Sequence, residues 1–395
     1  MPLESPFHPR TSRICTSHSW KDWAGFLAVC RYGCSLDSEY FAIRESAALI
    51  DVTPLFKYDI SGPQAETLLS RMTVRDVKKM KVGRVAYTCW CDDRGMVVDD
   101  GTVSRLDENT YRLTAADPTH HWLTRLAARY KVEIVDVTEK IAALAVQGPT
   151  SRNVLESCLD HDLSGLKFFQ TMPAKIGQVD VWVSRTGYTG DLGYEVWVAA
   201  DQAVQIWDAI FNAGRAHGIQ PTGLDALDIS RIEAGFILQG IDYFNCLRTQ
   251  IESRKTTPFE IGLGWLVDLD RDPFIGQEAL RKAADASKRQ LVGIEVNWED
   301  LEALYDSVDQ PPQLPAQASR SSIPVYRERR QVGRVSSHTW SPLLKKSIGL
   351  ATLEKDFCQP GQTVEVEHTV EFERRTVAAK VVKMPFFDPE RKRKP

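Results

Sequence analysis

The stretch Ser184-Arg-Thr-Gly-Tyr-Thr-Gly-Asp-Leu-Gly-Tyr-Glu-Val-Trp-Val198 decides how the middle of the chain folds. Apolar residues at 179–183 and 194–198 predict two paired strands, and the loop between them carries Gly187, Gly190 and Gly193. Glycine tolerates positive φ and lets another group approach the backbone closely. Glu195 lies one residue into the second strand, so its carboxylate is held on a rigid strand beside a glycine-rich loop. That arrangement suits the binding of a flat ring rich in hydrogen-bond donors, such as a pterin. The alternative is a β-hairpin whose turn residues have no role in ligand binding.

The bulk composition describes an ordinary globular protein. The chain has 395 residues, enough for two or three domains, and is 43% hydrophobic and 26% charged. Its net charge of -4 provides no basic field, so we expect no nucleic-acid partner. The basic end Arg391-Lys-Arg-Lys394 is interpreted as a solvated terminus rather than a targeting signal.

Targeting and metal signals are missing from the sequence pattern. No apolar run reaches the roughly 18 to 20 residues of a membrane span, and the first residues do not form a signal peptide. The eight cysteines are scattered, which favours reduced thiols and a cytoplasmic location without a membrane partner. Cys30 with Cys34, and Cys89 with Cys91, lack the spacing of a zinc site, so we expect no metal.

The order of motifs along the chain predicts several units. A strand, a Gly-Pro pair and a helix occur twice, at 58–69 and 143–155, which indicates two related α+β halves. From residue 290 short alternating strands predict a small β-barrel or sandwich. Residues 299–322, with three prolines, are expected to form an exposed, mobile loop, and the first forty residues to be irregular and pinned by aromatic side chains. A short strand is predicted at 265–267.

Two charged groups stand out in these units. Asp99 and Asp100 interrupt an apolar strand, and such acids are costly to bury unless they are paired or used. They are interpreted either as a general base or cation-stabilising carboxylate, or as a solvent-exposed pair at a strand end. The helix predicted at 223–235 carries Asp225, Asp228, Arg231 and Glu233, at least half of which should be structural.

Several separated motifs together resemble one family, the folate-dependent aminomethyltransferase (T-protein) superfamily of the glycine cleavage system. The most specific is Arg185-Thr-Gly-Tyr-Thr-Gly190 followed by Gly193-Tyr-Glu195. The others, in chain order, are Asp51-Val52, Gly95 with Asp99-Asp100, Ala145-Val-Gln-Gly-Pro149, Gly223-Leu224 with Asp228 and Arg231-Ile-Glu-Ala-Gly235, Pro258-Phe-Glu-Ile-Gly-Leu263, Phe274-Ile-Gly-Gln-Glu-Ala-Leu280, and Gly333, Ser336 and Pro385-Phe386 in the barrel.

The resemblance implies a three-domain cloverleaf of the α+β class with tetrahydrofolate in a central cavity. Its parts would be a first folate-binding α+β domain at 1–138 with 246–288, a second ferredoxin-like domain at 139–245, and a C-terminal β-barrel domain at 289–395. Glu195 would hold the amino edge of the pterin with Tyr188 beside it, and Asp100 would lie near folate N5 as the catalytic carboxylate. Tyr87, Arg231 and Trp265 complete the implied folate-binding set.

Departures from the family pattern concern the partner substrate. The T-protein pattern has arginine where this chain has Leu227, and Thr53-Pro-Leu-Phe56 replaces a Ser-His-Met-Gly run. These changes favour a tetrahydrofolate-dependent methyltransferase or demethylase acting on a small methyl donor: a sulfonium, an N-methyl amine or an aryl methyl ether. The alternatives are a true T-protein that takes an aminomethyl group from a lipoyl carrier protein, and a non-catalytic folate-binding factor. Side chains that would meet the donor are Trp20, Phe56, Trp90 and Leu227.

Overall fold

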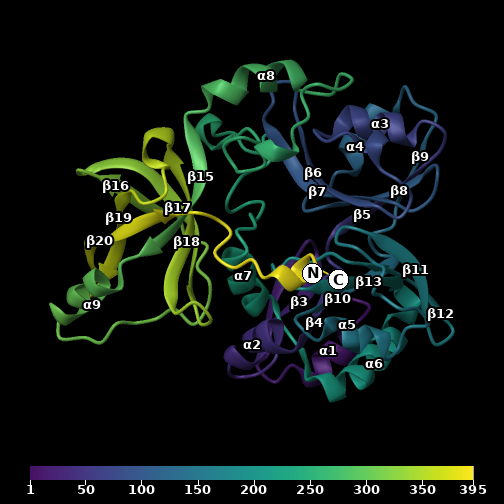
Figure 1. The fold of residues 1–395 in the computed structure, drawn as a ribbon, viewed down its shortest axis with the longest axis horizontal. Coiled ribbons are helices and arrows are strands. Elements are labelled where there is room, and N and C mark those ends of the chain that lie inside the picture. Colours follow the sequence, from purple (N-terminus) through teal and green to yellow (C-terminus); the bar gives the residue numbers. More distant parts are fainter. Residues whose placement is uncertain (395) are drawn as a thin grey trace.

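The computed structural model describes residues 1–394, which form three lobes around a common centre (Figure 1). The first lobe is a five-stranded sheet with the order β6-β7-β8-β5-β9. Helices α3 (Ala65–Met72) and α4 (His120–Ala127) pack on one of its faces through Leu68, Leu69 and Leu123. The strands are β5 (Phe56–Ser61), β6 (Val85–Cys91), β7 (Val97–Arg105), β8 (Thr110–Ala115) and β9 (Glu133–Asp136).

The second lobe is a six-stranded sheet with helices on both faces. Its order is β11-β12-β13-β10-β4-β14, and side chains alternate between two cores because strand periodicity is two. Leu49 faces helices α5 and α6, whereas Ile50 faces α2 and α7. The strands are β4 (Ala47–Asp51), β10 (Ile141–Gln147), β11 (Thr171–Ile176), β12 (Val179–Ser184), β13 (Gly193–Ala199) and β14 (Ile219–Pro221); the helices are α2 (Asp37–Glu45), α5 (Ser151–Glu156), α6 (Ala203–Gly214) and α7 (Leu224–Glu233).

The amino-terminal segment is regular, which corrects the expectation of irregular structure. Strands β1 (Leu3–Glu4), β3 (Phe26–Arg31) and β2 (Ser19–Trp23) form a small sheet, and helix α1 (His8–Ile14) lies between β1 and β2 in the chain. Phe7 and Val29 are buried in the same core as α6 and the second sheet. The segment therefore extends the second lobe.

The third lobe is a closed barrel with the strand order β15-β18-β17-β16-β19-β20. This confirms the predicted class, mixed α and β with a C-terminal β-barrel. The strands are β15 (Arg289–Val296), β16 (Ile323–Arg327), β17 (Arg330–Ser341), β18 (Lys346–Glu354), β19 (Thr363–Val370) and β20 (Glu373–Val382), and helix α8 (Gln277–Ala286) precedes them.

Three local expectations were wrong. The region 299–322 begins with helix α9 (Trp298–Asp306), because Asn297 caps the helix by accepting the Asp300 N–H at 2.9 Å and Leu301 and Tyr305 are buried on the barrel. Trp265 lies in a 3-10 turn (Gly264–Leu266) rather than a strand. Strand β4 belongs to the second sheet, because it pairs with β10 and β14, although it was assigned to the first domain. The amino-terminal segment likewise belongs to the second lobe and not to the predicted first domain; the other domain boundaries remain proposals.

The C-terminal segment leaves the barrel and crosses to the second lobe, where it forms a 3-10 turn (Glu390–Lys392) (Figure 1). Within residues 1–394, no helix is long and apolar enough to cross a membrane.

Candidate functional site

Asp100 is the best-defined polar centre of the structure. It lies on β7 opposite Cys89 of β6, and two phenols from different parts of the chain donate to its two oxygens. The Tyr87 hydroxyl donates to Oδ2 at 2.6 Å, and the Tyr243 hydroxyl donates to Oδ1. Burial raises the pKa of Asp100, and the Tyr243 and Tyr87 hydroxyls oppose that rise. The arrangement holds one carboxylate in a fixed orientation.

Asp99 has a different role from its neighbour. Its Oδ1 accepts the Asp100 N–H and its Oδ2 accepts the Asp117 N–H, both at 2.9 Å. Burial, with the Asp100 charge second, raises the pKa of Asp99 well above its ordinary range. Of the two acids, Asp100 is therefore the one expected to carry the negative charge, while Asp99 fixes the backbone beneath it. The expectation of a solvent-exposed pair does not hold, since Asp99 is fully buried.

Tyr243 carries no functional signal in the sequence. It lies in the loop after α7, and the same loop is attached to the first sheet through Gln239 and Asn245, whose side-chain amides both donate to Asp117 Oδ2 at 3.0 Å. No periodicity marks Tyr243 as functional, and it reaches Asp100 from 143 residues away. Only the long-range packing reveals it.

The hairpin β12–β13 contributes Tyr188 and Glu195. Glu195 pairs in register with Ser184, and its Oε2 accepts from the Thr186 hydroxyl at 2.9 Å. No other hydrogen bond to its carboxylate occurs within residues 1–394. Burial raises the pKa of Glu195 and the Thr186 hydroxyl lowers it. The carboxylate thus retains acceptor capacity for a donor-rich ligand.

Tyr188 connects this hairpin to the loop after α7. Its ring stacks on Phe236 with centroids 5.5 Å apart, and its hydroxyl donates to the Ile237 carbonyl. Burial raises the pKa of Tyr188, and the Asp100 charge contributes to the rise. The charge of Asp100 also raises the pKa of Tyr87. Ile237, whose carbonyl accepts from Tyr188, is buried in the cluster against which Tyr87 packs, so contacts link Tyr188 to Tyr87 and, through its hydroxyl, to Asp100.

The glycines of the hairpin serve a different purpose from the one expected. A Cβ at Gly187 would lie 2.0 Å from Gln147 Oε1, and one at Gly193 would lie 2.3 Å from Gln147 Cδ. The Gln147 amide donates to the Thr186 and Tyr194 carbonyls at 3.1 Å each. The close approach that Gly187 and Gly193 allow is made by the Gln147 side chain of this chain.

Arg231 is engaged inside the protein. Its guanidinium donates to Asp228 at 2.7 Å, to Asp242 at 2.8 Å and to Ser337 of the barrel at 2.8 Å. It is 1% exposed. The predicted direct contact with folate is not supported by this geometry; Arg231 instead links α7 to the barrel and to the segment that carries Tyr243.

Trp265 and the four side chains expected to meet a donor are dispersed. Trp265 is 70% exposed and lines a cleft with the segment before β6. Trp90 lies on the opposite face of β6 from Tyr87, because the two are three residues apart, and it is fully buried in the core of the first lobe. Trp20 packs on the core of the second lobe and Phe56 on that of the first. Leu227 is buried in an apolar cluster against which Tyr188 also packs.

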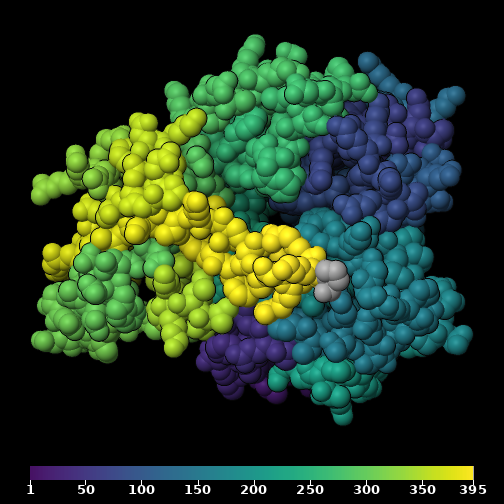
Figure 2. Space-filling model, in the orientation of Figure 1, coloured from purple at the N-terminus to yellow at the C-terminus, as the bar shows by residue number. Residues whose placement is uncertain are grey.

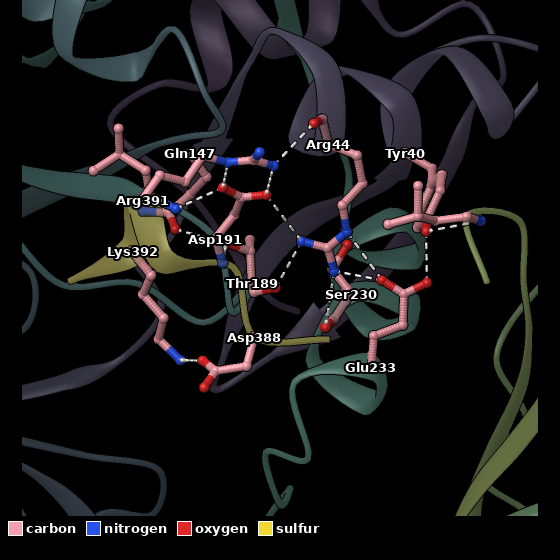
Figure 3. Close-up of polar contacts among 12 residues, drawn as sticks. Tyr40, Arg44, Gln147, Thr189, Asp191, Ser230, Glu233, Asp388, Arg391 and Lys392 are labelled. Atoms are coloured by element: carbon pink, nitrogen blue, oxygen red, sulfur yellow. Dashed lines mark hydrogen bonds and ion pairs between the residues drawn. The ribbon is translucent and has the colours of Figure 1, made fainter. Parts of the chain in front are cut away.

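The basic C-terminal segment is docked, which corrects its interpretation as a solvated end. Arg391 donates to both carboxylate oxygens of Asp191, at 2.6 and 2.8 Å (Figure 3). The Arg44 guanidinium lies 3.7 Å from the same carboxylate and donates to Glu233 at 2.9 Å. The Lys392 ammonium stands 5.0 Å from the centre of the Phe236 ring, on which Tyr188 stacks. The end of the chain therefore helps to fix the surroundings of Tyr188.

No group of three or more His, Cys, Asp or Glu side chains in the described part of the chain is arranged to hold a metal ion. The polar centre is instead built from carboxylates and phenols.

Comparisons with known proteins agree with this architecture. Residues 19–271 match the GCVT N-terminal domain, and residues 309–388 match the glycine cleavage T-protein C-terminal barrel domain. An aminomethyltransferase of Caldanaerobacter subterraneus is 35% identical over 87% of this chain and 87% of its own length. A trimethylamine-oxide aldolase of Ruegeria pomeroyi is 35% identical over 100% of this chain, which spans only 48% of that relative.

A solved structure confirms the fold independently. The glycine cleavage system aminomethyltransferase T from Bartonella henselae superimposes with a TM-score of 0.82 at 21% identity, covering 98% of this chain and 99% of that one. At that identity the likeness concerns the fold alone. The family matches and the relatives together confirm the resemblance inferred from the motifs: this chain belongs to the glycine cleavage T-protein family.

Proposed function

We propose that this chain is a tetrahydrofolate-dependent enzyme that moves a methyl group from a small methylated compound to tetrahydrofolate. The observation that carries the proposal is the carboxylate of Asp100, oriented by the hydroxyls of Tyr87 and Tyr243. Relatives named as aminomethyltransferases support a folate-dependent transferase. The relative named for trimethylamine oxide supports an N-methylated donor within the classes expected from the sequence.

Each residue has a defined task in this proposal. Glu195, with its unused acceptor capacity, would receive the amino group and ring N–H of a pterin. Asp100 would orient the reacting amine and stabilise positive charge that develops there as the one-carbon unit arrives. Tetrahydrofolate supplies the nucleophilic nitrogen. The two phenols keep Asp100 from rotating, which lowers the entropic cost of reaching the reactive arrangement.

The second candidate, aminomethyl transfer from a lipoyl carrier protein, is favoured by the names of several relatives that are 31% to 35% identical. Leu227 argues against it. Its side chain is 7% exposed within an apolar cluster, where the T-protein pattern has a cation. Position 227 is therefore apolar and buried in this chain.

A single experiment separates the two candidates. Purified protein and tetrahydrofolate are incubated either with a panel of free methyl donors or with an aminomethyl-lipoyl carrier, and the folate products are identified by mass spectrometry. We expect 5-methyltetrahydrofolate from a free donor, and Asp100→Asn should lower turnover by roughly 100-fold or more. Exclusive formation of 5,10-methylenetetrahydrofolate from the carrier would establish the second candidate.

Folate binding itself is tested without turnover. Tetrahydrofolate should raise the melting temperature of the protein, and Glu195→Gln should weaken binding by about 10- to 100-fold, the effect of losing a charged acceptor. Glu302→Gln, on the exposed surface of α9, is the matched control and should bind normally. If tetrahydrofolate gives no stabilisation and Glu195→Gln changes nothing, the proposal fails.

A further inference from the structure

Asp117 lies in the short segment between β8 and α4, where the chain holds its backbone on both sides. The proline that follows it restricts the Asp117 backbone to an extended conformation. The Asp117 N–H donates to Asp99 Oδ2 at 2.9 Å, and the Thr119 hydroxyl donates to the Asp117 carbonyl at 3.2 Å. The Asp99 carboxylate thus bridges β7 to the segment after β8, beyond the point where the regular pairing of the two strands ends. Asp117 is therefore a fixed point beside Asp100.

The Asp117 side chain reaches the loop after α7, which carries Tyr243. One carboxylate oxygen, Oδ2, accepts from the side-chain amides of Gln239 and Asn245, both at 3.0 Å. These two residues lie on either side of Tyr243 in the chain, so one carboxylate holds the loop both before and after the phenol. The next backbone N–H donates to a carbonyl of β7 at 3.0 Å, and Figure 2 shows the green part of the chain that follows packed against the blue first lobe.

The hydrogen bonds of Asp117 close a ring that passes through Asp100. From the Asp117 N–H the ring runs to Asp99, whose Oδ1 accepts the Asp100 N–H at 2.9 Å. It continues through the Asp100 carboxylate to the Tyr243 hydroxyl, and the loop leads from Tyr243 back to the Asp117 side chain. A displacement of Asp117 would therefore move the Tyr243 hydroxyl relative to the backbone that carries Asp100.

The negative charge of Asp117 is directed at these two amides. Its ion-pair partner is Arg248, which lies 3.6 Å from Oδ1 and is 57% exposed, so the pair contributes little. The Asp117 side chain itself is 16% exposed. Hydrogen bonds to an ionised acceptor are stronger than those between neutral groups. The carboxylate thus stabilises one position of the loop more than it stabilises an ion pair.

We propose that Asp117 is a positioning residue for the methyl transfer, because it places the Tyr243 hydroxyl against Asp100. The inference rests on the proposed function, since Asp117 acts through the carboxylate that we place at the reacting nitrogen. Tyr243 is also held from the barrel through its neighbour Asp242. Loss of the Asp117 side chain should therefore loosen the Tyr243 hydroxyl without removing it, and small displacements of reacting groups lower the rate strongly.

The kinetic test compares Asp117→Ala and Asp117→Asn in the full chain, with tetrahydrofolate and the donor that supports transfer by the natural protein. In Asp117→Ala, kcat should fall about 10-fold while the dissociation constant of tetrahydrofolate changes by less than about twofold. Asp117→Asn should restore most of kcat, because its side-chain oxygen can still accept from both amides. Asp59→Ala is the matched control and should keep kcat, since Asp59 also accepts two hydrogen bonds in the first lobe, from Arg112 at 2.7 and 3.0 Å.

A double-variant cycle assigns the loss of kcat to Tyr243. Because Tyr243→Phe already lacks the hydroxyl, adding Asp117→Ala to it should lower kcat by less than about twofold. Replacing both amide donors, Gln239→Ala together with Asn245→Ala, should lower kcat as much as Asp117→Ala does. The variant without the two amides also carries the test if Asp117→Ala does not fold.

A spectroscopic measurement reports the position of Tyr243 without turnover. The protein is prepared with meta-fluorotyrosine in place of tyrosine, and the fluorine NMR signal of Tyr243 is assigned by its loss in Tyr243→Phe. This signal should shift or broaden in Asp117→Ala, because the surroundings of the hydroxyl change. It should stay as in the natural protein in Asp117→Asn and in Asp59→Ala.

The possible failures are distinguishable. If the natural protein transfers methyl groups and Asp117→Ala does so equally fast, the inference is overturned and the proposed function stands. An equal loss of kcat in Asp117→Asn, or a full loss in the Tyr243→Phe background, likewise overturns the inference alone. If the natural protein transfers no methyl group, the proposed function fails, and an unchanged fluorine signal in Asp117→Ala would then refute the placement of Tyr243 by Asp117 as well.

Discussion

Replacing Arg391 should release the C-terminal segment from the second lobe. The Arg391 guanidinium makes two hydrogen bonds, at 2.6 and 2.8 Å, to Asp191, whose side chain is fully buried (Figure 3). The second cation near Asp191, Arg44, is 3.7 Å away and is also bonded to Glu233. In Arg391→Ala the buried carboxylate therefore keeps the Leu192 N–H at 2.7 Å but only one cation, the distant and shared Arg44.

The magnitude follows from the exposure of the pair. Hydrogen bonds to a charged group contribute about 1.5 to 3 kcal/mol, and breaking a fully buried pair costs about 3 to 5 kcal/mol. Because the Arg391 side chain is 41% exposed, solvent compensates part of that loss, and we expect a cost of about 2 kcal/mol. Since about 1.4 kcal/mol is tenfold in an equilibrium constant, the opening equilibrium of the segment should rise roughly 30-fold.

Hydrogen exchange of the segment measures this directly. The amides of Phe386 and Lys392 are protected by the Glu233 and Pro389 carbonyls, at 2.9 and 3.2 Å, and should exchange about 30-fold faster in Arg391→Ala. Arg393→Ala is the matched control, because Arg393 is 52% exposed and pairs with Asp388 at 2.9 Å on its own segment. Its effect should stay below about threefold. Equal exchange in the two variants, or a full Arg391→Ala effect in an Asp191→Asn background, would refute the reasoning.

Three further predictions concern buried polar groups. Tyr87→Phe should move the acidic limb of the pH–activity profile to higher pH, because the hydroxyl that lowers the pKa of Asp100 is lost and the carboxylate must be ionised to act. Lys57→Met should lower the free energy of unfolding by about 3 kcal/mol in denaturant titrations, because the Lys57 ammonium donates to the carbonyls of Thr53, Leu55 and Thr138, at 2.5, 2.8 and 3.1 Å. The control Lys131→Met should leave stability nearly unchanged. Burial, and to a smaller extent the charge of His368, lowers the pKa of His338 to about 4. The unfolded state therefore binds more protons than the folded state between pH 4 and 6.5, and the free energy of unfolding should fall by roughly 2 to 3 kcal/mol as the pH drops through that window. His338→Gln should lose this part of the pH dependence.

Much of the fold could be predicted because it depends on local patterns. The alternation of 363–370 and 376–382 indicates strands of a barrel whose interior positions, such as Val364 and Val381, are fully buried. Residues 47–51, which form β4, were placed in the first domain because an apolar run marks a buried element but does not show which sheet it joins. That choice is made by pairing with β10, about 95 residues away.

Residues of the candidate site could be predicted only where the residue type is unusual for its secondary-structure element. Asp100 stood out because an acid interrupts an apolar strand, and its hydrogen bonds explain how the acid is tolerated. Trp90 could have been excluded, since residues three apart on a strand face opposite sides. Tyr243 and Arg391 could not have been identified, because their partners are 143 and 200 residues away and their sequence surroundings are ordinary for a loop and a basic terminus.

The polar interior connects all three lobes to the candidate site. Ser336 and Ser337 of the barrel donate to Asp242 Oδ1, at 2.5 and 2.8 Å, and Arg231 of α7 donates to the other oxygen of the same carboxylate. The next residue, Tyr243, donates to Asp100 on the first sheet. The barrel and α7 therefore determine where the Tyr243 hydroxyl lies, and that hydroxyl determines the orientation and the pKa of Asp100. The packing of the lobes against one another thus sets the orientation of the carboxylate that we place at the reacting nitrogen. Substitution of Ser336 or Ser337, the barrel partners of Asp242, should therefore change the orientation and the pKa of Asp100 without removing any residue that we propose to contact the folate.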